Sequence, residues 1–164
     1  ESLPKKFPGI DVEQALHLYR ERYEHTGWQE NALYNGIAEE IRRLHLQGFT
    51  IALCTSKPRV FAERIIHHFS LTRYFDGVHG PELDGRFDKK TDLLAHLIAH
   101  YAVAPQNAVM IGDRDKDVEA AQHVGAHSLG VLWGFGSHDE LHGAGAKRII
   151  AQPSELVHTI HSLA

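Results

Sequence analysis

Short apolar segments alternate with amphipathic helical segments along this chain, and the alternation restricts its fold more than any other feature. Residues 49–54 (FTIALC) are short and mostly apolar, as in a parallel strand that is covered on both faces. Residues 108–111 (AVMI) form a second run of this kind before a helix-like segment. Strands that alternate with helices predict a parallel α/β sheet with right-handed crossovers.

The spacing of apolar residues, together with glycine and proline, locates the other elements. Gly27 and Gly48 end two predicted helices, and Pro58 opens a third. Gly134-Phe135-Gly136-Ser137 is predicted to be a loop that either lines a site or only turns the chain. We predict helices at 11–25, 36–47, 59–69, 91–101, 117–124 and 153–163, and strands at 49–54, 74–79, 108–111 and 128–133.

Composition excludes several classes of protein. The 164 residues suffice for one domain with a core, or for one domain and a small appendage. The net charge of −4 and the scattered Lys and Arg residues give no sign of a nucleic-acid partner. No apolar run approaches the roughly 18 residues of a membrane span, and no signal-peptide core follows the N-terminus. The single cysteine, Cys54, excludes an intrachain disulfide and favours a reducing compartment, so we predict a cytoplasmic protein.

Three aspartates crowd the end of the apolar run at 108–111. The sequence MIGDRDKDVEAA, residues 110–121, contains Asp113, Asp115 and Asp117. Carboxylates this close repel one another, and one of them shifts toward protonation unless a cation balances the charge. The cluster is therefore either a solvated turn that caps the next helix or a metal site.

Several motifs, taken in order, resemble the haloacid dehalogenase (HAD) superfamily, and in particular its phosphoglycolate phosphatase-like branch. Each motif is weak alone, and the order and spacing of the set carry the resemblance. The main ones are LCTSKP, DGRFDKKTDLL and MIGDRDKD, and the others are YRERYEHTGWQENALYNG, YFDGVHG, LGVLWGFGS, HGAGAKRII and PSELV. The resemblance implies a three-layer, Rossmann-like parallel sheet, part of a small helical cap, and Mg²⁺-dependent phosphoryl transfer through an aspartyl nucleophile.

The same resemblance assigns the site residues. Thr55 is implied to hold a phosphoryl oxygen, with Ser56 and Lys57 beside it as further substrate-binding residues. The resemblance makes Lys90 the lysine that neutralises the phosphate, because KTDLL fits the family's pattern, and makes Asp113 and Asp117 the Mg²⁺-binding residues. These residue types suit the chemistry, since phosphoryl transfer needs positioning and charge neutralisation. Mg²⁺ prefers oxygen ligands and keeps several waters, so one or two carboxylates suffice.

Each assignment has a simpler alternative. Thr55 could only cap a helix, and Lys90 could be a solvated helix charge like its neighbour Lys89. Asp115 has no role in the family and is predicted to be solvated, and Cys54 is predicted to be an inert apolar filler. The pairs His67-His68 and His96 with His100 could bind a transition metal, but solvated helix faces explain them more simply.

The first motif of the family, Asp-x-Asp-x-Thr after an apolar strand, is not found in this sequence. The resemblance begins partway through the cap, so residues 1–34 are predicted to be the C-terminal part of the cap and residues 35–164 the α/β core. In this family the first strand lies centrally, between the strands predicted at 49–54 and 108–111. Without it both strands would present unpaired backbone edges, so we expect the chain to be part of a longer protein.

These observations predict a Mg²⁺-dependent phosphatase of small phosphate monoesters, such as phosphoglycolate or nucleoside monophosphates. The first alternative is a catalytically inactive module that binds Mg²⁺ or a phosphorylated ligand. The second is a receiver domain of two-component signalling, which also uses acidic residues, a Thr and a Lys at strand ends, but in a different order along the chain.

Overall fold

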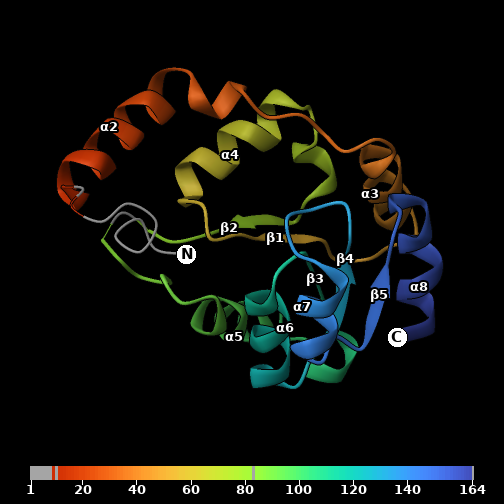
Figure 1. The fold of residues 1–164 in the computed structure, drawn as a ribbon. Coiled ribbons are helices and arrows are strands. Elements are labelled where there is room, and N and C mark those ends of the chain that lie inside the picture. The colour runs from red at the N-terminus through yellow and green to blue at the C-terminus, as the bar shows by residue number, and fades with distance from the viewer. Residues whose placement is uncertain (1–8, 10, 83, 164) are drawn as a thin grey trace.

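The computed structural model describes residue 9 and residues 11–82 and 84–163. Helices and strands alternate along the chain as its apolar pattern predicts (Figure 1). The α-helices are α2 (Val12–His25), α3 (Ile37–Leu46), α4 (Arg59–His68), α5 (Lys90–His100), α6 (Asp115–Val124), α7 (His138–Gly143) and α8 (Leu156–Leu163). The strands are β1 (Ala52–Cys54), β2 (Gly77–His79), β3 (Val109–Gly112), β4 (His127–Val131) and β5 (Arg148–Ile150). Four 3-10 turns, η1 (Gly27–Gln29), η2 (Thr72–Tyr74), η3 (Pro105–Asn107) and η4 (Pro153–Glu155), connect them.

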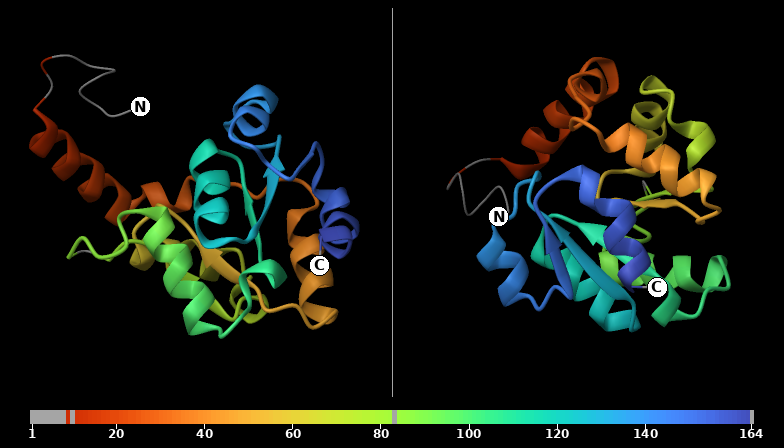
Figure 2. Two further views of the ribbon diagram at one scale, coloured as in Figure 1. Left: turned by 90° about the horizontal axis from the view of Figure 1, so that it is seen from below. Right: turned by 90° about the vertical axis from the view of Figure 1, so that its right-hand side faces the viewer.

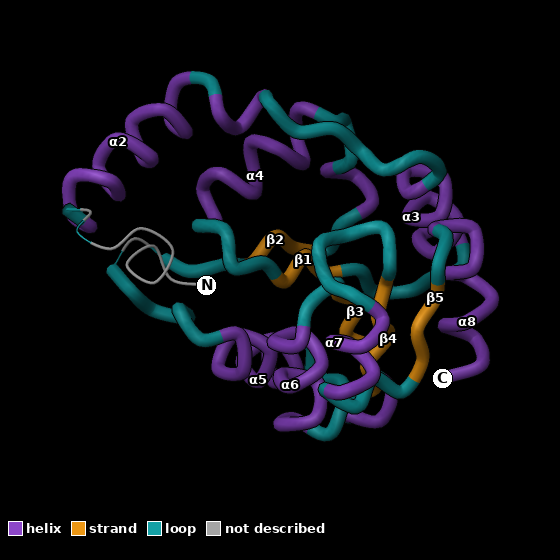
Figure 3. The backbone as a smooth tube through the Cα atoms, viewed as in Figure 1, coloured by secondary structure: helices purple, strands orange, loops and turns teal. Residues whose placement is uncertain are grey.

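All strand pairings are parallel, which confirms the predicted α/β class. β1 pairs with β2 in the register Leu53 to Val78, while β4 lies between β3 and β5 with Ile111 opposite Leu129. Among the described residues the strands form two separate groups, β1-β2 and β3-β4-β5, with no pairing between β1 and β3 (Figure 3). This break lies where the family resemblance expects another central strand.

The two groups of strands are covered by helices on both faces. One core cluster joins α3 and α8 to β4 and β5, and Val109 of β3 packs against it. Met110, the next residue of β3, belongs to a second cluster with Leu94 of α5 and Ala121 of α6. Adjacent strand residues point to opposite faces, so β3 has helices on both sides, as a buried parallel strand requires. The exception is Ile111, which is 38% exposed although it is a large apolar residue of this strand.

Helix α2 extends away from the strands and their covering helices, as the left view of Figure 2 shows. The carboxylate of Asp11 caps it by accepting a hydrogen bond from the backbone of Gln14 at 3.1 Å. The chain then passes through η1, which contacts α4, before it enters α3. The division into a cap part at 1–34 and a core at 35–164 remains a prediction, and residues 1–8 and 10 lie outside the described residues.

The predicted elements are present, but several differ in their bounds. Strand β1 covers only Ala52–Cys54 of the predicted 49–54, β4 covers His127–Val131 in place of 128–133, and the predicted helix at 153–163 begins as the turn η4. The strand predicted at 74–79 is shorter because Thr72–Tyr74 forms the turn η2. Helix α6 begins at Asp115 rather than Asp117, so Asp115 lies in the first helical turn. Strand β5 and helix α7 were not predicted from the sequence. Within the described residues, no helix is both long enough and apolar enough to cross a membrane.

Candidate active site

The predicted site residues lie just beyond the carboxyl ends of β1 and β3 and at the start of α5. Thr55 follows Cys54, the last residue of β1, and its backbone N–H donates to the carbonyl of His79 at 3.0 Å. The Thr55 hydroxyl accepts a hydrogen bond from the backbone N–H of Lys57 at 3.1 Å. The segment after β1 is therefore a tight turn that fixes the Thr55 hydroxyl at the carboxyl edge, where ligands of such sheets bind.

Lys90 and Asp117 form an ion pair across this edge. Lys90 is the first residue of α5, and its ammonium donates to Oδ1 of Asp117 in the first turn of α6. The two side chains are only 17% and 6% exposed. The other carboxylate oxygen of Asp117 accepts from the backbone N–H of Arg114 at 3.1 Å. The pair is therefore well shielded, and Lys90 is not the solvated helix charge that its simpler interpretation predicted.

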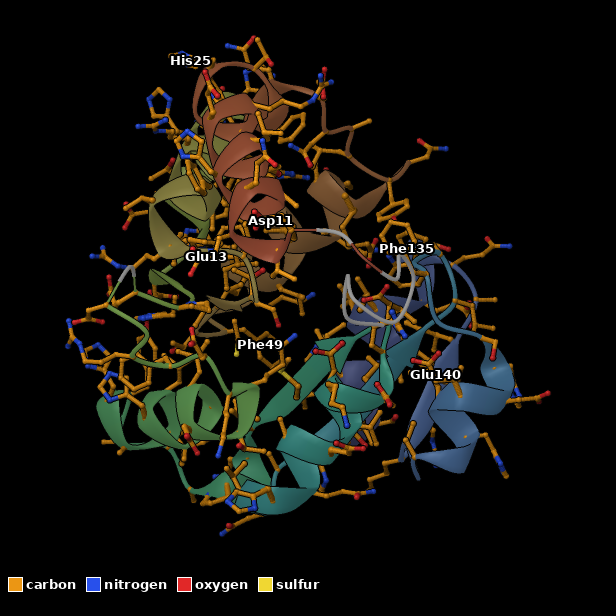
Figure 4. The ribbon with its side chains drawn as sticks, turned by 60° about the vertical axis from the view of Figure 1, so that its left-hand side comes forward. Asp11, Glu13, His25, Phe49, Phe135 and Glu140 are labelled. Carbon is orange, nitrogen blue, oxygen red and sulfur yellow. The ribbon has the colours of Figure 1, made fainter. Side chains whose placement is uncertain are left out.

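Asp113 follows β3 and is held by the loop after β4. Its Oδ2 accepts the backbone N–H of Phe135 at 2.7 Å, a short charge-assisted hydrogen bond. The Phe135 side chain is 90% exposed, so only its backbone takes part in this contact. Figure 4 shows Phe135 and Glu140 on the segment that follows β4. The loop at 134–137 is therefore more than a turn, because it lies against Asp113.

Two glycines make this close packing of backbone and carboxylates sterically possible. A Cβ atom on Gly112 would lie 2.2 Å from Cγ of Asp117, and one on Gly134 would lie 2.3 Å from Cβ of Asp113. Real Cβ atoms do not approach heavy atoms this closely, so a larger residue at either position would displace an acidic side chain. The absence of a side chain at Gly112 and Gly134 thus allows the backbone to lie against the carboxylates of Asp117 and Asp113.

Glu140 is a supporting residue that sequence reasoning missed. Its Oε1 accepts from the side chain of Arg114 at 2.7 Å and from the backbone N–H of Asp115 at 3.0 Å. These hydrogen bonds lower the pKa of Glu140, with the Arg114 contact as the largest cause. Ser137 caps α7 by accepting from the backbone of Glu140. The Ser-x-x-Glu spacing at 137–140 was the available signal, since it marks a helix start.

Cys54, the last residue of β1, lies between the Thr55 turn and the helices that carry the charged pair. Burial, the largest cause, raises the pKa of the Cys54 thiol to about 11, and the charges of Lys90 and Asp117 act on it in opposite directions. Cys54 also packs against the apolar cluster that contains Leu94 of α5 and Ala121 of α6, the two helices that carry the pair. A thiol with this pKa stays protonated at neutral pH, which agrees with the prediction that Cys54 is inert.

The described residues alone do not assemble a complete metal centre. No three His, Cys, Asp or Glu side chains gather among them in a way that could hold a metal ion. Asp113 and Asp117 nevertheless offer carboxylate oxygens at one strand end, and this donor set suits Mg²⁺, which takes one or two protein carboxylates and keeps waters. Asp115 lies aside from them, with its carboxylate directed to the backbone N–H of Lys116 at 2.7 Å.

Comparison with known proteins decides the family. The sequence pattern of the haloacid dehalogenase-like hydrolases matches residues 2–125, and a related HAD-like pattern matches residues 89–163. The chain belongs to the haloacid dehalogenase-like hydrolases. A predicted phosphatase of this fold from Clostridium acetobutylicum superposes with a TM-score of 0.90 at 36% identity, covering 97% of this chain and 75% of that one.

Curated relatives carry more than one name. A 5'-nucleotidase from Pseudomonas aeruginosa is 42% identical over 128 residues, which are 78% of this chain and 58% of the relative. The tyrosine-protein kinase PtkA of Mycobacterium tuberculosis is 37% identical over 131 residues, 80% of this chain and 45% of that protein. A phosphoglycolate phosphatase from Vibrio cholerae is 33% identical over 129 residues, 77% of this chain and 56% of that enzyme. The chain thus spans about half the length of these relatives.

Proposed function

We propose that the whole protein is a Mg²⁺-dependent phosphatase of small phosphate monoesters, similar to the phosphoglycolate phosphatases. The observation that carries the proposal is the shielded ion pair of Lys90 and Asp117 at the edge where Thr55 and Asp113 follow their strands. A cation, a hydroxyl and two carboxylates at one edge are the groups that phosphoryl transfer uses for positioning and charge neutralisation. Relatives named 5'-nucleotidase and phosphoglycolate phosphatase support the same class of substrate.

Each residue has a defined role in this proposal. The Thr55 hydroxyl and nearby backbone N–H groups bind phosphoryl oxygens, and Ser56 and Lys57 complete the substrate-binding turn. Lys90 neutralises charge on the phosphate. Asp113 and Asp117 hold Mg²⁺, which when bound neutralises further phosphate charge and orients the transfer. A lysine gives a compact positive charge, which explains the type of residue at position 90.

The nucleophile in this proposal is an aspartate on a strand between β1 and β3. These strands are unpaired with each other among the described residues, and Ile111 is exposed beside the break. A strand placed there would satisfy both backbone edges and carry its last side chain to the edge with Thr55 and Asp113. Its carboxylate oxygen would form a bond to phosphorus while the bond between phosphorus and the ester oxygen breaks, and the alcohol would leave. Water would then hydrolyse the acyl phosphate, which releases inorganic phosphate and restores the carboxylate.

The test is phosphate release by the whole protein from phosphoglycolate, a nucleoside monophosphate and p-nitrophenyl phosphate. We expect turnover that requires Mg²⁺ and stops with EDTA, and no turnover by residues 1–164 alone, because they contain no suitable nucleophile. Turnover of p-nitrophenyl phosphate by the 164-residue chain would contradict the proposed nucleophile. Failure of the whole protein to release phosphate from any ester would contradict the proposed activity.

An inactive module that binds Mg²⁺ or a phosphorylated ligand is the second candidate. The absence of an Asp-x-Asp-x-Thr sequence from residues 1–164 favours it over an enzyme only if the whole protein also lacks this motif. The same assay separates the two, since such a module would bind phosphate and release none from esters.

We also propose that the protein is cytoplasmic, because a single cysteine favours a reducing compartment.

A further inference from the structure

Tyr23 of helix α2 contacts Lys57, which lies 34 positions later in the turn after β1. The ammonium of Lys57 donates a hydrogen bond to the Tyr23 hydroxyl. The same ammonium lies 4.1 Å from the centroid of the Tyr23 ring, within the range of a cation–π interaction. One aromatic side chain therefore holds this lysine by two different interactions.

Tyr23 is itself fixed by several parts of the structure. Its ring meets the ring of Phe61 in α4 edge to face, with 5.3 Å between the centroids and 62° between the planes. The ring also packs against buried Gly27 of η1, where an added Cβ would lie only 3.0 Å from the ring. Such restrained aromatic packing leaves the hydroxyl in one place, so Tyr23 is a rigid partner for a flexible lysine.

The backbone of Lys57 is fixed equally well at the phosphate-binding turn. Its N–H donates to the Thr55 hydroxyl at 3.1 Å. Its carbonyl lies so close to Gly80 that an added Cβ there would be 2.3 Å away. Lys57 thus has its backbone in the turn that contains Thr55 and its ammonium on helix α2.

We propose that Tyr23 is a positioning residue that acts on the substrate phosphate through Lys57, by holding its ammonium beside the Thr55 turn. The inference rests on the proposed function, in which this turn binds the phosphate. A lysine side chain has substantial rotamer freedom, and binding an anion must restrict it. Restriction by Tyr23 before binding lowers that entropic cost, which is the general effect of preorganisation.

The decisive substitution is Tyr23→Phe in the whole protein, because it keeps the ring against Phe61 and removes only the hydroxyl. We expect KM for the ester to rise roughly threefold to tenfold, the range that one hydrogen bond supplies, with kcat within about twofold. Lys57→Met should raise KM by more. Adding Tyr23→Phe to Lys57→Met should then change KM by less than about twofold, since the two residues act as a unit.

A matched control isolates the contact. Tyr34→Phe removes the hydroxyl of an exposed tyrosine outside the proposed site and should not change KM. An equal rise in KM for Tyr23→Phe with and without Lys57→Met would overturn the inference, because the hydroxyl would then act independently of Lys57.

Binding of inorganic phosphate, followed through the NMR signals of the Lys57 side chain, provides a readout that does not depend on turnover. The half-saturating phosphate concentration should be higher in the Tyr23→Phe protein than in the wild type. If both proteins bind phosphate equally well, the positioning role is wrong while the proposed phosphate site stands. If the wild type binds no phosphate and hydrolyses no ester, the proposed function itself fails.

Discussion

The ammonium of Lys90 at the start of α5 is paired with the carboxylate of Asp117 in the first turn of α6. Both side chains are largely withdrawn from solvent, so each charge depends on the other for compensation. The pair also joins two helices that pack side by side, α5 against β1 and α6 against β3 and β4 (Figure 1). Its loss should therefore affect both the stability of the fold and the proposed chemistry.

Lys90→Met should leave the Asp117 carboxylate without its countercharge. Removing one partner of a buried pair typically costs about 3 kcal/mol or more, and the free energy of unfolding by urea should fall by about this amount. In the whole protein the variant should also lose phosphatase activity, because phosphate charge is no longer neutralised. The matched control is Lys89→Met, which changes an exposed neighbour and should stay within about 0.5 kcal/mol. Equal losses from the two variants would remove the distinction between these lysines.

Asp113 and Asp115 should respond differently to replacement by Asn. Asp113 lies beyond β3 in contact with the loop after β4, whereas Asp115 is directed to its own helix start. In the whole protein, Asp113→Asn should lower turnover by roughly a hundredfold or more, the range for removing a charge-stabilising group. Asp115→Asn should retain most activity over a Mg²⁺ titration. The reverse result, an inactive Asp115→Asn beside an active Asp113→Asn, would show that the metal ligand is wrongly assigned.

Glu40 should contribute to the free energy of unfolding, although it belongs to α3 and not to the proposed active site. It is only 4% exposed, and its carboxylate accepts from Arg43 at 2.7 Å and from the backbone N–H of Val157 in α8 at 3.3 Å. Glu40→Ala should leave that buried N–H without its acceptor and cost about 2 kcal/mol in urea unfolding. Glu39→Ala is the control, because it breaks only an exposed pair with Arg42 and should cost less than about 1 kcal/mol. A smaller loss for Glu40→Ala than for Glu39→Ala would contradict this account.

His79 should make the fold less stable in mild acid. Burial, the largest cause, lowers the pKa of His79, and the neighbouring His100, His96 and Arg59 lower it further while Glu63 opposes them. Because the folded state disfavours the protonated ring, the unfolded chain binds more protons as pH falls. The His79 contribution is therefore fully favourable above pH 6.5, the ordinary value, and is lost as pH falls from there through the folded pKa.

Urea unfolding at pH 7.5 and at pH 5.5 tests this dependence. The wild type should lose more stability over this interval than His79→Asn, in which the titrating ring is absent. His161→Asn is a suitable control, because His161 is an exposed histidine on α8 and lies in another part of the fold. An identical pH dependence in wild type and His79→Asn would show that the pKa of this ring is the same in the folded and unfolded states.

The local elements were largely determined by the sequence. Amphipathic spacing locates α3, α4 and α5 to within a residue or two, because one face of each helix must be apolar to pack against the strands. The acidic cluster could also be named from the apolar run before it, whereas Thr55 and Lys90 were assigned through the resemblance to a family, which separates Lys90 from Lys89. The resemblance to a family then assigned these residues, which are far apart in sequence, to one phosphoryl-transfer site.

Tertiary structure decided the features that depend on partners far away in the chain. β5 has only three residues and begins with exposed Arg148, so its strand character comes from pairing with β4 and not from local preference. The hydrogen bond from Phe135 to Asp113 and the contact of Tyr23 with Lys57 join residues more than twenty positions apart. A local apolar pattern specifies which face of an element is buried, but it does not specify which other element covers that face. The contact of the loop after β4 with Asp113 and the attachment of α2 to the turn after β1 are therefore properties of the folded arrangement, because each arises from contacts that only packing creates.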